Sequence, residues 1–176
     1  LQHSSSKVLG MMRRSIDGPQ TQKVIDRIKA KVPGVILRTT LIVGHPGEDR
    51  REFDKLLRFV ERNKFDRLGA FTYSEEEGTY GALHFKDTVR ESTKQSRYEE
   101  LMELQSGISL EANQARVGTV ERVIVDSYTD GVLVCRSQGE SPEVDGEILI
   151  GDFGKFAPEQ LIGKFVTAKI TAANEY

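Results

Sequence analysis

The chain has 176 residues, of which 38% are hydrophobic and 30% are charged, and its formal net charge is −2. These values predict one globular domain or one and a half, without a general attraction to nucleic acid or to a membrane surface. No stretch of the sequence approaches the roughly 18 consecutive apolar residues that a membrane-spanning helix needs.

The first residues, LQHSSSK, lack both an initiator methionine and the charged and apolar pattern of a signal peptide. We therefore expect the sequence to begin inside a longer chain. Residues 4–14 predict a short helix that follows a strand whose body precedes Leu1. If LQH ends that strand, Gln2 and His3 project at its carboxyl end, where both can hydrogen-bond a ligand. Otherwise His3 is an ordinary surface residue.

Residues 19–34 predict a helix that Pro33-Gly34 ends. Its apolar face consists of Val24, Ile25, Ile28 and Val32. Residues 35–44 then form a nearly continuous, β-branched apolar run, which is typical of a strand covered on both faces.

The next helix is predicted to begin near Glu48 and Asp49, because a helix N-terminus favours negative charge. Its apolar stripe consists of Phe53, Leu56, Leu57 and Val60. Residues 67–74 are the following strand. A strand, a helix and a strand with short connections predict a right-handed parallel βαβ unit.

Residues 90–115 contain no proline and predict one long helix, with a weak point at Gly107. The apolar side of this helix consists of Tyr98, Leu101, Met102, Gln105, Ile108 and Ala112. The pattern changes near residue 116, so we expect two parts, 1–115 and 116–176. The fold class is therefore α/β followed by all-β.

The second part predicts four or five short strands. Two β-branched runs are joined by Thr129-Asp130-Gly131, a strong hairpin signal. Further strands are expected in 143–150 and 163–174, and together they suggest a small antiparallel barrel of the OB or SH3-like kind. Residues 116–176 hold six Lys and Arg against ten Asp and Glu, so this part carries a charge of −4.

The stretch LIVGHPGE, residues 41–48, is the first candidate site. Ligands of parallel sheets bind beyond the carboxyl ends of the strands. Gly44 and Gly47 allow the main chain to approach a ligand closely, and Ile42 and Val43 could lie against a flat apolar ring. The alternative is an ordinary turn between a strand and a helix. His45 is expected to be exposed.

Two acidic stretches are further candidates. Tyr73 ends a strand and is followed by Glu75, Glu76 and Glu77, which form either a solvated turn or an acidic lip for a basic substrate. Residues 136–147 form either an acidic surface loop or a recognition loop. A nucleic-acid-binding barrel would carry Lys, Arg and aromatic residues here, so the charge favours a cationic protein partner.

A metal site is not expected. The three histidines are scattered, and the single cysteine, Cys135, excludes both a disulfide framework and a cysteine-ligated cluster within these residues. One cysteine also suits a reducing, cytoplasmic location.

Several motifs resemble the radical S-adenosylmethionine methylthiotransferases. They are LQHSSSKVLGMMRR, RTTLIVGHPGE, FDRLGAFTYSEEEGT and SGISLEANQARVGT, in this order, and the all-β part resembles the TRAM domain of that family. The resemblance covers essentially all 176 residues. Two positions depart from the family pattern, because His45 stands where an aromatic residue is usual and Glu140-Ser141 replaces Asp-Ala.

The resemblance implies the C-terminal portion of a radical S-adenosylmethionine partial (β/α) barrel in residues 1–115 and a TRAM barrel in residues 116–176. Cofactor-binding residues implied for S-adenosylmethionine are Gln2, His3, Thr39, Ile42, Val43, Gly44, Pro46 and Tyr73. Substrate-binding residues implied are Glu75, Glu76, Glu77, Arg136, Glu143 and Asp145. No catalytic residue and no metal ligand is expected in this chain.

The family also uses two 4Fe–4S clusters, which six cysteines upstream of this region hold. Without those cysteines we expect this chain by itself to be inactive and to work with the upstream part of its own chain. Within the family the pattern RSQGESPEVDG, residues 136–146, resembles the branch that methylthiolates an aspartate of ribosomal protein S-twelve.

Two alternatives stay open. The sister branch modifies a tRNA adenosine, but it typically reads QSGS where this chain reads QHSS and its TRAM domain is typically basic. The acidic second part therefore makes RNA binding unlikely and a basic ribosomal protein the better partner. The other alternative is a TRAM-type binding module without enzymatic activity.

Overall fold

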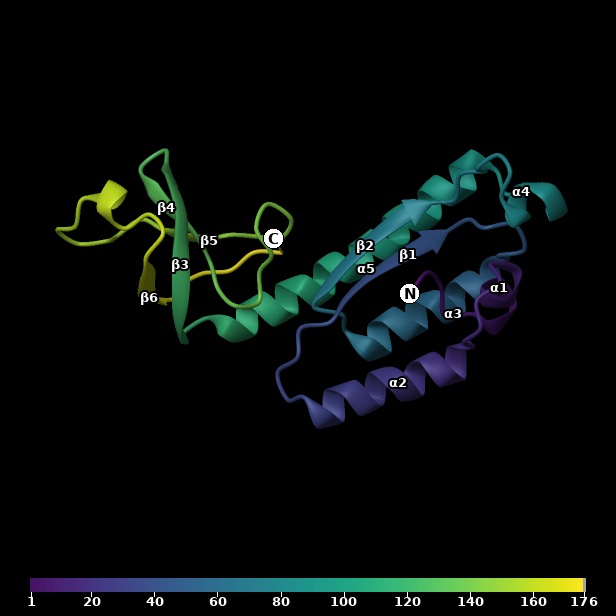
Figure 1. The fold of residues 1–176 in the computed structure, drawn as a ribbon, viewed down its shortest axis with the longest axis horizontal. Coiled ribbons are helices and arrows are strands. Elements are labelled where there is room, and N and C mark those ends of the chain that lie inside the picture. Colours follow the sequence, from purple (N-terminus) through teal and green to yellow (C-terminus); the bar gives the residue numbers. More distant parts are fainter. Residues whose placement is uncertain (176) are drawn as a thin grey trace. The chain divides into compact units, whose positions relative to one another are not determined.

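The computed structural model describes residues 1–175 of the chain (Figure 1). They form two compact units, which divide between Ile108 and Ser109. The division falls inside helix α5, Glu91–Arg116, which continues from one unit into the other. Each unit has its own hydrophobic core.

The first unit contains the predicted strand–helix–strand arrangement. Its elements before α5 are α1 (Ser6–Met11), α2 (Gly18–Lys31), β1 (Arg38–Val43), α3 (Arg50–Asn63), β2 (Arg67–Thr72) and α4 (Tyr80–His84). All of these elements except α4 were predicted, and their prediction is confirmed. Helix α4, which follows Glu75, Glu76 and Glu77, was not indicated by the sequence pattern. The long helix over 90–115 is confirmed by α5.

Strands β1 and β2 pair in parallel, with Ile42 opposite Phe71. The prediction that the first of these strands is covered on both faces is wrong, because burial alternates along β1. Thr39, Leu41 and Val43 are buried, whereas Arg38 and Thr40 are exposed. Successive side chains of a strand point to opposite faces, so the sheet has one face against the core and one open face.

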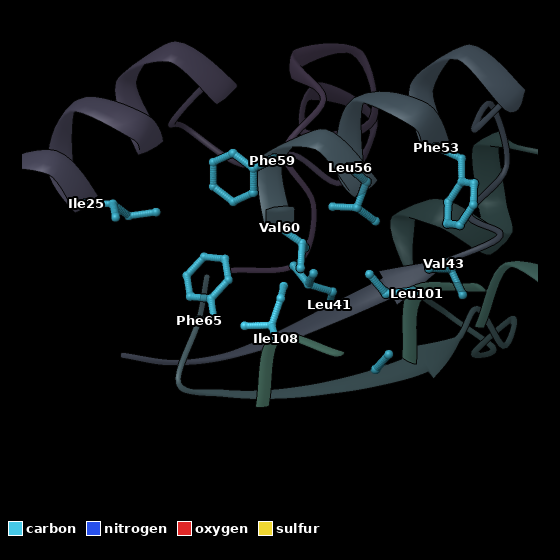
Figure 2. Packing of buried hydrophobic residues seen from close by; sticks show 11 residues of the cluster. Ile25, Leu41, Val43, Phe53, Leu56, Phe59, Val60, Phe65, Leu101 and Ile108 are labelled. Atoms are coloured by element: carbon cyan, nitrogen blue, oxygen red, sulfur yellow. The ribbon is translucent and has the colours of Figure 1, made fainter. Parts of the chain in front are cut away.

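The core of the first unit lies between the sheet and three helices. Figure 2 shows Leu56 and Val60 of α3 on the side of Leu41 of β1 and Phe53 over Val43, and all five side chains are fully buried. Helix α5 adds Leu101 to the same cluster. The apolar stripe predicted for α3 is therefore the main layer that covers the sheet.

Helix α2 contributes less to this core than its pattern predicted. It ends before Pro33-Gly34 as expected, but of its four apolar residues only Ile25 is buried. Val24 and Val32 are 38% and 50% exposed. Hydrogen bonds between Gln22 and Asn63 also join α2 to α3, and the N-terminus of α2 is fixed by a capping box between Asp17 and Gln20.

The second unit is a four-stranded antiparallel sheet with the strand order β5-β4-β3-β6. Its elements are β3 (Val120–Thr129), β4 (Val132–Arg136), β5 (Ile148–Ile150), the short helix η1 (Pro158–Gln160) and β6 (Phe165–Lys169). The predicted hairpin is confirmed: Asp130 and Gly131 both have positive φ and connect β3 to β4.

A small antiparallel barrel was predicted for the second unit, and this is confirmed in part, because the described strands form a curled antiparallel sheet, or half-barrel. Strands β5 and β6 are its two edges and do not pair with one another. One face of the sheet is packed on a small core that includes Val123, Val125 and Leu133.

Cys135 lies in that core and is 1% exposed. Burial raises the pKa of its thiol to about 11, and the nearby Asp126 carboxylate acts in the same direction. The thiolate is the reactive form of cysteine, so this thiol is chemically inert near neutral pH. Among residues 1–175 no helix is long and apolar enough to cross a membrane.

The core of the first unit yields a stability prediction. Replacing Leu56, which is fully buried, with alanine should lower the free energy of unfolding by about 2–5 kcal/mol, because it removes packing and leaves a cavity. Leu83→Ala is the matched control, since Leu83 is 70% exposed, and should change stability by less than about 0.5 kcal/mol. Urea unfolding followed by helical circular dichroism measures both; equal effects would contradict the described core.

Candidate functional site

The open face of the β1–β2 sheet carries the candidate site. Because paired residues of a sheet share a face, this face consists of Arg38, Thr40 and Ile42 from β1 with Arg67, Gly69 and Phe71 from β2. A hollow of about 540 Å³ lies on it. The residues that line the hollow are Leu1, Gln2, Arg38, Thr39, Thr40, Ile42 and Phe71.

The N-terminal segment forms one wall of the hollow. The Ile42 N–H donates to the carbonyl of Gln2 at 2.8 Å, so this segment runs beside β1. Gln2 is half-buried and its amide can donate and accept hydrogen bonds. The sequence analysis expected Gln2 and His3 at the carboxyl end of a strand if LQH ends one, and the structure places Gln2 beside Ile42, near the end of β1.

The hollow combines an apolar surface with a few polar groups. Ile42 and Phe71 are adjacent in the paired register and offer an apolar surface for a flat ring, and Phe71 is 64% exposed. Gln2 and Thr40 supply hydrogen-bonding groups next to that surface. Apolar walls with a few polar groups are the usual composition of a small-molecule site.

Beyond β1 the chain turns sharply at Gly44. Its φ is +78°, and an added Cβ would clash with the side chain of Lys94. Its N–H donates to the Glu48 carboxylate at 3.0 Å, which closes the turn onto the start of α3. Glycine is therefore required here both for conformation and for space.

Glu48 is the centre of a buried ionic network. It is 3% exposed, and its Oε1 accepts a hydrogen bond from Arg97 of α5 at 2.9 Å. Arg97 also donates to the Glu48 carbonyl at 3.0 Å. The other oxygen, Oε2, accepts from Gly44 and lies 3.3 Å from His3 Nε2. One carboxylate thus connects the N-terminal segment, the turn and α5.

His3 is fully buried, in contrast to the surface position usual for a histidine near a chain end. Its Nδ1 accepts the Ser5 N–H at 2.9 Å, which assigns the proton of the neutral ring to Nε2. That proton faces Glu48, although the geometry falls short of a hydrogen bond. His3 therefore supports the wall of the hollow from behind.

Lys94 forms a second buried contact at the carboxyl end of the sheet. Its ammonium donates to Asp87 at 2.7 Å and to the carbonyl of Tyr73 at 3.0 Å, and it lies 3.3 Å from Glu91. Burial acts to lower the pKa of Lys94, but the hydrogen bonds to Asp87 and Glu91 outweigh it, and the pKa is raised. Lys94 stays charged. It holds the segment between β2 and α5 at Tyr73, just after β2, and at Asp87, shortly before α5.

His45 was predicted to be exposed, and this is wrong, because it is 4% exposed. Its ring lies edge-on to Tyr73 with 4.9 Å between ring centroids, and close to Phe85 at 6.3 Å. Burial lowers the pKa of His45, so the ring is neutral and packs as an aromatic residue. Burial likewise raises the pKa of Tyr73.

The predicted cofactor residues fall into two groups. Gln2, Thr39 and Ile42 line the hollow. His3, Val43, Gly44 and Pro46 are buried behind it or in the turn, and Tyr73 is half-buried against His45. Val43 belongs to the core face, because it neighbours Ile42 on a strand and points to the opposite side.

The predicted substrate residues lie in two separate places. Glu75, Glu76 and Glu77 are exposed in the segment between β2 and α4 of the first unit. The others belong to the second unit, where Arg136 pairs with Asp126 at 3.0 Å. Asp145 accepts the Ser141 N–H at 2.7 Å, which closes a turn around the exposed Glu143.

A half-buried arginine, Arg116, holds the loop that follows β4. Arg116 forms two hydrogen bonds with Glu121, at 2.9 and 2.8 Å, and a third with Glu140 at 2.9 Å. Glu140 also accepts the Ser137 N–H at 2.7 Å. These hydrogen bonds, with burial opposing them, lower the pKa of Glu121 and raise that of Arg116. The Glu140 carboxylate therefore has a structural role in this loop.

The sequence analysis missed the residues that hold the site together. In the first unit they are Glu48 as an ion-pair partner, Arg97, Lys94 and Asp87. In the second unit the analysis likewise missed the contact of Arg116 with Glu140. The spacing of Lys94, Arg97, Leu101, Gln105 and Ile108 along α5 follows a helical face and was a usable signal. Among residues 1–175 no group of three or more His, Cys, Asp or Glu side chains is arranged to hold a metal ion.

The chain is similar in sequence to known proteins. The TRAM domain family model matches residues 117–176. A ribosomal protein uS12 methylthiotransferase RimO of Parabacteroides distasonis is 46% identical over 176 residues, which is 100% of this chain and 40% of that protein. The chain resembles the C-terminal part of RimO.

Further RimO proteins match over the whole chain. The relative from Porphyromonas gingivalis is 46% identical over 178 residues, and this chain covers 40% of it. The relative from Cytophaga hutchinsonii is 43% identical over 176 residues, and the coverage is 39%. The chain therefore spans about 40% of the length of the RimO relatives, and these matches include both units.

The turn at Gly44 yields a stability prediction. Gly44→Ala should destabilise the first unit by about 2 kcal/mol more than Gly34→Ala, because only the former overpacks against Lys94. Gly34 is the matched control, since its φ is +74° and open space surrounds it. Both variants pay for the left-handed conformation, so the difference in unfolding free energy isolates the contact. Equal losses would show that Lys94 moves away freely.

The Glu48 network gives a second test. Arg97→Ala should lower the free energy of unfolding by about 3–5 kcal/mol, because it leaves the Glu48 carboxylate buried without its charged partner. Arg50→Ala removes the exposed pair with Glu100 and should cost no more than about 1 kcal/mol. Urea titrations of both variants measure the contrast. A loss below about 1 kcal/mol for Arg97→Ala would mean that water replaces the arginine.

Proposed function

We propose that this chain is the cofactor-side and substrate-recognition part of an enzyme that methylthiolates an aspartate of ribosomal protein uS12. The observation that carries the proposal is the match of both units to RimO proteins along the whole chain. The hollow supports it, because its apolar and polar groups suit S-adenosylmethionine. That cofactor supplies radical chemistry, and this chain supplies binding and orientation.

The residues of the hollow have distinct tasks in this proposal. Ile42 and Phe71 bind the adenine ring, while Gln2 and Thr40 hydrogen-bond the polar part of the cofactor. The Glu48 network holds the turn and the N-terminal segment in place around it. No side chain of this chain needs to act as a general acid or base. The role of this chain is to hold the reacting groups together and to exclude water.

Iron–sulfur clusters belong to the proposed reaction, but this chain does not fit them. The one cysteine, Cys135, is buried in the second unit and its thiol stays protonated. Residues outside this sequence must hold the two 4Fe–4S clusters, and this chain alone is expected to be inactive.

The second unit recognises the protein substrate in this proposal. It carries more acidic than basic side chains, and ribosomal proteins are basic, so the two attract each other. Glu143 is exposed on the loop after β4, and the Arg116–Glu140 contact fixes that loop. The same charge repels a phosphate backbone, which disfavours the tRNA-modifying alternative. Such an enzyme works in the cytoplasm, where ribosomal proteins are assembled.

Mass spectrometry tests the proposed reaction. An enzyme of the relatives' full length that contains this sequence is expressed in a bacterium without its own uS12 methylthiotransferase. We expect a methylthio group on an aspartate of uS12 and none on tRNA adenosine. Modified tRNA with unmodified uS12 would establish the tRNA enzyme instead, and no modification of either would favour a binding module.

Charge reversal tests the recognition loop. Glu143→Lys should weaken binding of uS12 about fivefold or more at low salt, because it places a positive charge against a basic partner. Glu159→Lys is the matched control, since it makes the same charge change at an exposed site of the second unit outside that loop. Binding is measured by calorimetry at two salt concentrations. Salt-independent binding, or equal effects of both variants, would contradict recognition by this loop.

A further inference from the structure

Two neighbouring helices of the first unit, α2 and α3, carry a surplus of positive charge. Helix α2 has four Lys and Arg against one Asp, and α3 has five against three Asp and Glu. The whole chain, in contrast, has a net charge of −2. Hydrogen bonds between Gln22 and Asn63 and the ion pair of Asp26 with Arg62 hold the two helices together (Figure 1). Positive charge is therefore concentrated in one part of the first unit.

On α2, three cations form a row along the side that faces solvent. Lys23, Arg27 and Lys31 follow one another at intervals of four residues, so they share one face of the helix at steps of about 6 Å. All three are exposed, whereas Ile25 on the opposite side is buried. Within residues 1–175 none of these three side chains has an ionic partner, because the one acidic residue of the helix, Asp26, pairs with α3. We call these three residues the basic row.

Helix α3 adds unpaired positive charge next to α2. Arg51 and Arg58 lie two turns apart and are exposed, and in the described part of the chain no ion pair engages either of them. Arg50 of the same helix differs, because it pairs with Asp54 and with Glu100. Unpaired cations are thus a property of particular positions on these helices.

The basic row fits a polyanion. Like charges four residues apart on a helix repel each other, whereas an acidic residue at that spacing would have stabilised the helix. A partner with repeated negative charge removes this repulsion along the whole row. The phosphate backbone of RNA is such a partner, and cations that neutralise its phosphates gain free energy from the release of bound counterions.

A membrane surface is the less suitable polyanion. A basic helix that lies on a membrane carries Trp, Phe or Leu beside its cations, and these side chains enter the lipid. The apolar side chains that α2 exposes beside the basic row are Val24 and, at the end of the helix, Val32. They are 38% and 50% exposed. The observations therefore favour RNA.

We propose that the basic row of α2 binds the phosphate backbone of ribosomal RNA, so that the enzyme acts on uS12 within the assembled small ribosomal subunit. The proposal rests on the proposed function, since that function brings the chain to uS12. The charges of the two units then match the two components of the particle: the acidic second unit suits a basic protein, and the basic row suits RNA. Phosphate contacts position a protein without reading sequence, which is sufficient for this task.

The test uses the full-length enzyme that contains this sequence and small subunits from a bacterium without its own uS12 methylthiotransferase. The variant Lys23→Gln/Arg27→Gln/Lys31→Gln removes the basic row at exposed positions, and thermal unfolding verifies that it stays folded. Binding of the labelled enzyme to the subunits is measured by fluorescence anisotropy at several salt concentrations, without reductant, so that no turnover occurs. Methylthiolation of assembled subunits and of free uS12 is measured separately.

We expect the variant to bind the subunits about tenfold or more weakly at low salt. The slope of log affinity against log salt concentration should fall by about 2–3, because three phosphate contacts are lost. The KM for assembled subunits should rise by a similar factor with kcat unchanged. Activity on free uS12 should not change, because the free protein offers no RNA.

The matched control removes the same number of positive charges from the second unit. Lys155→Gln/Lys164→Gln/Lys169→Gln changes three exposed side chains outside α2. We expect this variant to keep both the affinity for the subunits and the salt slope of the unsubstituted enzyme. Equal losses in both variants would show an effect of overall charge and would overturn the proposal.

Three further results would overturn it. The first is unchanged binding of the subunits after loss of the basic row. The second is an equal loss of activity on free uS12, which would assign the row to the protein substrate. The third is lost binding to vesicles of anionic phospholipid with subunit binding intact, which would assign it to a membrane. Failure of the proposed function looks different, because the unsubstituted enzyme would then modify no aspartate of uS12 in either form.

Discussion

The buried Glu48 carboxylate is the constraint on which the candidate site depends. It accepts hydrogen bonds from Gly44 and Arg97 and faces His3, so three segments far apart in the sequence meet at one group. A buried charge is tolerated only when it is paired and hydrogen-bonded. The N-terminal segment, the turn after β1 and α5 must therefore take up their positions together, and the hollow in front of them is formed before a ligand arrives.

The second unit repeats this principle with the charges reversed. Arg116 is half-buried and binds two carboxylates, one at the start of β3 and one in the loop after β4. The contacts join the end of α5 to β3 and to the loop after β4. In each unit one charged side chain with several partners positions a neighbouring segment. This side chain is Glu48 in the first unit and Arg116 in the second.

Much of the fold follows from local patterns in the sequence. The stripe of α3, the hairpin at Asp130-Gly131 and the long α5 are each specified by residues within one element. The burial of His45 and His3 could not be predicted, because their partners Tyr73 and Glu48 lie far away in the sequence. The continuous apolar run of β1 suggested two covered faces, and only the pairing with β2 shows which side chains stay open.

Burial alternates along the six residues of β1, so neighbouring positions serve different purposes. One set is constrained by packing of the core and the other by what the hollow binds. Leu41 and Val43 belong to the packed core, whereas Arg38, Thr40 and Ile42 face the hollow. Substitutions at the second set can change what the chain binds without loss of stability, so specificity can evolve independently of the fold. An insertion or deletion of one residue in this strand has the opposite effect, because it exchanges the two faces and damages both at once.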